Sequence, residues 1–276
     1  MSMVKLYAWT TPAFFKDSIV DHTWVTAYDN RVTPYSSIDA VVEASSDYWY
    51  SWGSFHPAGT ALIAQGTASL EAATYLCEPN ADSRNDRAAA GTIFVYGIDG
   101  VCHQLANQIL WSTGSATQAP RTVELARGYH VSSALYGTYG LNKDDWIQHR
   151  DGAPQAANVS LTYALPIDNG DDFERHARAV LAGSGGSAKL ASLLAYRKQH
   201  ARETLKTKSD VKLAQVIPTA DSINARVNEF LGGALGILGP DDFKRVFQID
   251  PLPNMNLVDP DLFAQTTAVQ KPANQP

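Results

Sequence analysis

Cys102 is the residue whose setting in this sequence most favours covalent chemistry. The stretch GIDGVCHQLANQIL puts it after a glycine-containing turn and in the first turn of a predicted helix. Unpaired backbone N–H groups and the helix dipole at such a position stabilise a thiolate and lower the thiol pKa. The same N–H groups can bind a developing oxyanion. Cys102 is therefore a candidate nucleophile for attack on an amide or ester carbonyl.

A nucleophilic cysteine needs a base, which is usually a histidine. The candidates are His22, His56, His103 and His130. His103 directly follows Cys102, and successive helical residues point about 100° apart, so His103 is poorly placed to take the thiol proton. His22 lies in the segment SIVDHTWVTAY, which is typical of a strand, and shares a strand face with Trp24. We therefore predict His22 as the base.

Further polar residues complete the predicted site. His56, in WGSFHP, follows a predicted strand and is a candidate to orient His22 or to bind substrate. Tyr96 precedes Cys102 by six positions and is a candidate hydrogen-bond donor. The residues predicted to bind substrate or the oxyanion are Tyr96, His103, Gln104 and Trp24.

The elements that must position these residues follow from composition and periodicity. All six Trp and eleven of the twelve Tyr lie before residue 165, where β-branched residues are also frequent. We predict strands there over 4–9, 19–28, 47–55 and 91–97 and helices over 36–44, 67–77 and from 101. After residue 165, Ala, Leu and long charged side chains predict helices over 171–183, 188–207, 221–235 and 241–247. Residues 140–170 are predicted to be rich in loops.

The order DHTWV, WGSFHP and YGIDGVCHQLANQIL resembles the circularly permuted branch of the NlpC-type, papain-like thiol peptidases. The resemblance covers about residues 4–113. It implies Cys102 as nucleophile, His22 as base and His56 as the third polar group. The sequence departs from the family at Thr23 and Trp24, where an aliphatic run is usual, and in an insertion that contains Cys77.

This resemblance and the composition together predict an α+β fold in three parts. Residues 1–165 are expected to form a papain-like domain with an antiparallel sheet and a Cys-bearing helix. Residues 166–250 are expected to form a helical extension, and residues 251–276 a Pro-rich tail, extended or disordered.

Two functions from different classes follow. The first is a cysteine-dependent hydrolase or acyltransferase that acts on a peptide, small amide or ester through a thioester, without a cofactor. The second is a non-catalytic papain-like binding or assembly module whose helical extension recruits a partner or a second copy. In that case Cys102 is a small buried residue, as Cys77 is expected to be. His22 is then a core histidine whose hydrogen bonds are satisfied. A metal site is disfavoured, because no two histidines have the helical i, i+4 spacing.

Composition limits the partners. The chain has 276 residues, 22 Lys+Arg and 28 Asp+Glu, so its net charge is −6. This charge disfavours nucleic-acid binding through overall basicity. A basic amphipathic helix over 189–208 is usually a solvated face, although it can also bind an acidic partner, a membrane surface or RNA. The sequence has no apolar run of about 18 residues and no recognisable export signal, so we expect a cytoplasmic protein with reduced cysteines.

Overall fold

The structure is a computed structural model, and it has an α+β fold built on a three-stranded antiparallel sheet. The described residues are 3–13, 15–27, 29, 60–77, 96–115, 118–153, 171–183, 185–212 and 218–260. They form this sheet and eight α-helices, as the fold class predicted. The expected helix over 36–44, the expected strand over 47–55, most of that over 91–97, and His56 lie outside the described residues.

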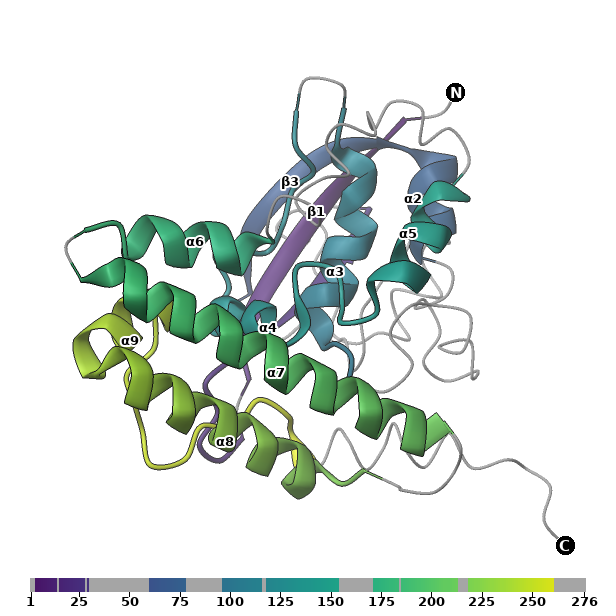
Figure 1. The fold of residues 1–276 in the computed structure, drawn as a ribbon. Coiled ribbons are helices and arrows are strands. Elements are labelled where there is room, and N and C mark those ends of the chain that lie inside the picture. The colour runs from purple at the N-terminus through teal and green to yellow at the C-terminus, as the bar shows by residue number, and fades with distance from the viewer. Residues whose placement is uncertain are drawn as a thin grey trace, which may run out of the picture.

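The sheet has the strand order β2-β1-β3, with β1 in its middle (Figure 1). The strands are β1 (Met3–Pro12), β2 (Asp21–Thr26) and β3 (Ala61–Ser69). The first two were predicted, whereas β3 was not. The register between β1 and β3 shifts at Ala8 and Trp9, so Ile63 and Ala64 both pack toward the helices. This bulge bends β3 where it borders the groove described below.

Helix α3 (Cys102–Leu110) covers one face of the sheet and fixes the position of Cys102. Leu6, Ala8 and Val25 on this face pack with Ala106 and Ile109 of the helix. The other face carries Trp9 and Trp24, which are also fully buried. Trp9 and Trp24 are thus shielded from water although they lie on the face opposite α3.

Three of the described helices before residue 165 differ from expectation. The helix predicted over 67–77 begins later, as α2 (Leu70–Cys77), because β3 continues to Ser69, whose hydroxyl accepts a hydrogen bond from Ala72 N. A second helix, α4 (Tyr129–Tyr136), lies between Gly128 and Gly137, both with positive φ. A third, α5 (Lys143–Asp151), occupies part of the segment predicted to be loops.

The predicted C-terminal helices are all present, with somewhat different ends. They are α6 (Asp172–Val180), α7 (Gly186–Lys212), α8 (Ala220–Leu238) and α9 (Pro240–Phe247). They gather below the sheet, with α7 as the longest and foremost (Figure 1). Their apolar side chains share one hydrophobic cluster with Val101, Leu105 and Val131. This cluster therefore contains residues from both sides of residue 165.

The segment after α9 packs onto the same core. Met255, Leu257 and Val258 are buried, and Asn224 of α8 hydrogen-bonds the backbone of Leu257 and Val258 at 2.8–3.0 Å. The described part of the predicted tail is thus extended and docked. No helix among the described residues is both long and apolar enough to span a membrane.

Candidate functional site

Cys102 is the first residue of α3, as predicted, but its thiol is only 4% exposed. Sγ points to the carbonyl oxygen of Asp21 at 4.0 Å. Burial raises the pKa of the Cys102 thiol, and this effect exceeds the opposing effect of hydrogen bonds from Thr23, Tyr96 and the backbone of His103. The group is therefore a neutral thiol at pH 7, not the thiolate that nucleophilic attack requires.

The predicted base, His22, lies on the face of β2 that α3 does not cover. Side chains alternate along a strand, so the odd-numbered residues of β2 share one face and the even-numbered residues share the other. Thr23 hydrogen-bonds the thiol from the odd face, and β1 and β2 pair without a register shift. The even face carries His22 and Trp24, whose rings stack with centroids 5.5 Å apart. The rings of His22 and Trp24 share a face of the strand, as expected, but this face is the one opposite Cys102.

His103 is held by two hydrogen bonds that define its tautomer. Its Nε2 lies 3.0 Å from the carbonyl oxygen of Asp21, which can only accept, so Nε2 carries the proton. Nδ1 then accepts from the Ser132 hydroxyl at 2.7 Å. Burial lowers the pKa of His103 to about 4, so the ring is neutral at pH 7. This serine–histidine–carbonyl row has the order of a catalytic triad, yet His103 and Ser132 are fully buried.

The other residues of the predicted site also have structural partners. Gln104 accepts from Val101 N at 3.1 Å, which caps α3, and donates to Gly137 O at 3.0 Å. Tyr96 lies beside the thiol as predicted, but it is buried. None of the described His, Cys, Asp and Glu residues form a group of three that could hold a metal ion. The hydrogen bonds around Cys102 therefore organise the start of α3.

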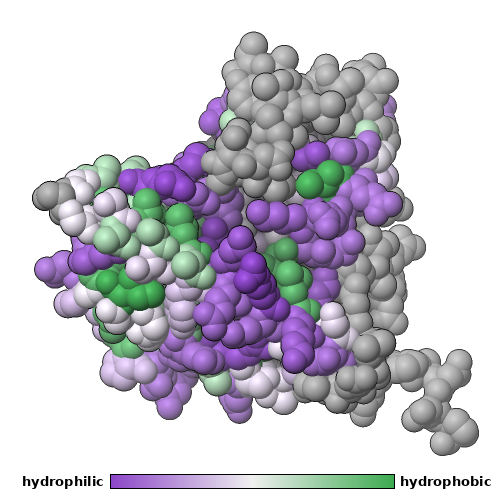
Figure 2. Space-filling model, in the orientation of Figure 1, coloured by the Kyte–Doolittle hydropathy of each residue, from purple (hydrophilic) through white to green (hydrophobic). Residues whose placement is uncertain are grey.

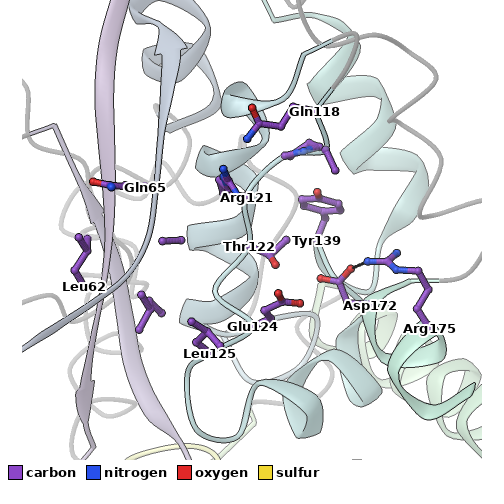
Figure 3. Close-up of a pocket in the computed structure, with 14 residues that line it drawn as sticks. Leu62, Gln65, Gln118, Arg121, Thr122, Glu124, Leu125, Tyr139, Asp172 and Arg175 are labelled. Atoms are coloured by element: carbon purple, nitrogen blue, oxygen red, sulfur yellow. Dashed lines mark hydrogen bonds and ion pairs between the residues drawn. The ribbon is translucent and has the colours of Figure 1, made fainter. Parts of the chain in front are cut away.

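A groove of about 690 Å³ lies elsewhere, between β3 and the segment that precedes α4. Four consecutive residues of β3, 62–65, line one wall, and residues 118–122, 124 and 125 line the other. Figure 3 shows Leu62 and Gln65 on the side of β3 that faces away from Arg121 and Glu124. Because Ile63 and Ala64 pack on one side of β3 and Leu62 and Gln65 lie on the other (Figure 3), the feature common to all four is the main chain of β3.

Buried polar side chains form the inner end of this groove. Asp172 is 6% exposed and opens α6, and its carboxylate pairs with Arg175 (Figure 3). The hydroxyl of Tyr129 donates to Asp172 at 2.5 Å and accepts from Asn107 Nδ2 at 3.1 Å. Desolvation and the adjacent carboxylate raise the pKa of Tyr129 well above its usual value, so the hydroxyl remains a donor. The carboxylate of Asp172 therefore already has partners within the fold.

Sequence reasoning did not find the groove. Its walls come from β3, from the segment before α4 and from α6, which are far apart in the chain. One signal was present: residues 61–69, ALIAQGTAS, contain no charge and no proline. A strand at a sheet edge usually carries a charged residue or a proline, which prevents it from pairing with the strand of another chain.

The buried thiol makes a direct prediction. Iodoacetamide at pH 7 is expected to leave Cys102 unmodified in the native protein and to alkylate it once urea unfolds the chain. Peptide mass spectrometry measures both, and the unfolded sample is the reactivity control. Fast native alkylation of Cys102, at a rate at or above that of the unfolded chain, would show an accessible activated thiol and contradict this geometry.

No protein-family model, no curated protein and no solved structure matches the chain.

Proposed function

We propose that this protein is a binding module that receives an extended peptide segment of a partner along the edge of β3. The observation that carries the proposal is the groove beside residues 62–65, whose shared wall is main chain. A peptide that adds a strand to a sheet edge gains affinity from main-chain hydrogen bonds and specificity from the side chains around it. The groove offers both: the main chain of β3 on one side, and the side chains of residues 118–122, 124 and 125 on the other.

The edge of β3 supports strand addition. Among the described strands, β3 pairs only with β1, so its other edge has no partner strand among them, and residues 62–65 of β3 line the groove. Residues 61–67 are all partly or fully exposed, and none is charged or proline. Such an edge is a template for a further strand. A partner segment would satisfy its N–H and C=O groups and cover its apolar side chains.

The opposite wall favours a single strand over a second copy of this protein. Residues 118–122, 124 and 125 lie across the groove from β3, so β3 faces a second wall at this place. A peptide fits such a space, whereas the sheet edge of another folded copy would meet this wall. Arg121, Glu124 and the 73% exposed Leu125 offer a cation, an anion and an apolar contact to peptide side chains.

The thiol hydrolase or acyltransferase is the other function expected from the sequence. It requires a thiolate with a base within hydrogen-bond reach and an open path for substrate. The buried, neutral Cys102 and the placement of His22 on the other sheet face argue against it. The binding module needs neither residue to react.

Peptides selected from a random linear library on the immobilised protein provide the test. Fluorescence anisotropy of a selected peptide is expected to show about 10-fold weaker binding to Leu125→Asp, because an apolar contact is lost and a charge is added to the groove wall. Two series of peptides are N-methylated at alternate peptide bonds, and the two series, or phases, differ by one residue in where the methyl groups lie. Only one phase is expected to weaken binding, because only alternate N–H groups of the peptide face β3.

Leu252→Asp is the matched control, since Leu252 is 48% exposed and lies outside the groove. Its affinity for the peptide should equal that of the unaltered protein. The proposal is wrong if no peptide is selected, if both aspartate variants weaken binding equally, or if N-methylation has no effect in either phase. Turnover of a peptide or ester that is abolished by Cys102→Ser would instead support the thiol hydrolase or acyltransferase.

A further inference from the structure

The basic residues of α7 fall into two groups. Those directed toward the rest of the molecule each pair with an aspartate of another segment. The pairs are Lys189 with Asp242, Arg197 with Asp171, and Lys208 with Asp99. The Lys208–Asp99 pair is almost completely buried, with Nζ and Oδ2 2.9 Å apart. These three cations are thus neutralised within the fold.

The second group forms a row on the solvent side of α7, which we call the basic row: Lys198, Arg202 and Lys206. All three are exposed, and their four-residue spacing puts them on one face at intervals of about 6 Å along the axis. No described carboxylate forms an ion pair with any of them. Hydrophilic residues also gather over this part of α7 in Figure 2.

Repulsion within the basic row has an energetic cost, and no described carboxylate forms an ion pair with the row, although Asp210 lies one turn after Lys206 on the same helix. Like charges four residues apart on a helix repel, by about 0.2–0.5 kcal/mol for each neighbouring pair. The neighbouring Glu203 accepts a hydrogen bond from Gln199 at 3.1 Å and forms no ion pair with the row. The whole chain has a net charge of −6, so the row does not follow from a generally basic composition.

We propose that the basic row is the docking site for an acidic helical segment of a partner protein, with carboxylates repeated every four residues. Such a segment places its charges at the same interval of about 6 Å and can meet all three cations at once. The partner would supply in trans what Asp242, Asp171 and Asp99 supply to the inner cations. This surface is separate from the β3 groove and does not depend on it.

Two other classes of anionic partner fit the surface less well. Single-stranded nucleic acid usually stacks its bases on aromatic side chains, but Tyr196 of α7 already stacks on Phe230 with centroids 5.5 Å apart. An amphipathic helix binds a membrane by burying its apolar side in lipid. The apolar side of α7 packs on the core through Leu193, which is fully buried. A protein carboxylate needs neither a free ring nor an apolar face.

The probe is a labelled alanine-based helical peptide with glutamate at every fourth position, measured by fluorescence anisotropy against the full-length protein. We expect binding that weakens as salt rises. In the variant K198Q/R202Q/K206Q the affinity should fall by about 10-fold or more. A peptide with glutamine in place of glutamate should not bind.

The control variant K5Q/K16Q/K143Q removes three exposed lysines from other elements and lowers the net charge equally. It should bind the acidic peptide like the unaltered protein. Equal weakening in both triple variants would show a general charge effect and overturn the site, as would a lack of binding to the unaltered protein. Tighter binding of a single-stranded oligonucleotide or of anionic phosphatidylserine vesicles, lost in the row variant, would overturn the acidic protein as the partner.

Discussion

Replacing Arg197 by methionine is expected to cost about 3–5 kcal/mol of the free energy of unfolding, a large part of the stability of an average domain. The guanidinium joins three helices. It donates to the carbonyl oxygens of Ser133 and Ala134 at the end of α4, at 2.8 and 2.6 Å, and pairs with Asp171 at the start of α6. It also lies over the ring of Phe173, 5.1 Å from the centroid.

The size of the effect follows from what the substitution leaves behind. Asp171 is buried, and its carboxylate would lose the cation that pairs with it, while two helix-end carbonyl groups would lose their donor. Methionine retains most of the apolar stem, so lost packing contributes little. Urea unfolding followed by tryptophan fluorescence measures the change.

A matched control lies on α6. Arg178 is 58% exposed and pairs with Glu174 one turn away, so Arg178→Met should cost about 0.3–0.5 kcal/mol. Adding Asp171→Asn to Arg197→Met should recover part of the loss, because the unpaired charge is removed while the amide oxygen still caps the backbone of Glu174. Equal losses in the two single methionine variants would show that the Arg197 interactions do not stabilise the fold.

Local patterns predicted the elements whose signals are strong and continuous. Aromatic and β-branched runs identify β1 and β2, and apolar spacing with acidic first turns identifies α6 and α9. β3 was missed because its alanines and glycine have weak strand preference. Gly66 is required there, since a Cβ would come within 2.7 Å of Thr113. That requirement comes from tertiary packing and leaves no local pattern.

The candidate site shows a sharper limit of sequence reasoning. Strand parity correctly grouped His22 with Trp24, and the glycine turn correctly put Cys102 at a helix start. Parity does not determine which face of the strand the helix covers, and α3 covers the face of Val25. The face of β2 that α3 covers therefore decides whether His22 lies beside Cys102 or on the opposite side of the sheet. The groove required knowledge of how β3 lies against residues 118–125.

Two buried histidines make the protein sensitive to mild acid. Burial lowers the pKa of His103 from 6.5 to about 4. Burial, and secondarily the proximity of His176, lower the pKa of His130 to about 4. The His130 and His176 rings stack with centroids 3.7 Å apart, and His130 Nδ1 has no partner among the described residues. Neither ring can gain a proton without loss of favourable burial.

The sign of the effect follows from proton binding. Between pH 6.5 and about 4 the unfolded chain binds more protons at these two positions than the folded chain. Stability from these groups is therefore complete above pH 6.5 and is lost as the pH falls toward 4. Each histidine contributes a loss of about 2–3 kcal/mol by pH 4.5. Lys189 lowers the pKa of Asp242. The stability that this group contributes is therefore lost only at a lower pH, below its usual pKa of 3.8.

The variant H103Q/H130F is expected to lose about 5 kcal/mol less stability than the unaltered protein between pH 7 and pH 4.5. His149 and His200, whose pKa values are also lowered by burial, remain in both proteins and contribute equally to both. Glutamine retains an acceptor for Ser132 and a donor for the Asp21 carbonyl, and phenylalanine retains the stack on His176. Urea unfolding at several pH values measures the slope, which reports the number of protons taken up. If both proteins lose the same free energy over this range, these histidines titrate normally and are not shielded by the core, and the acid sensitivity belongs to other groups.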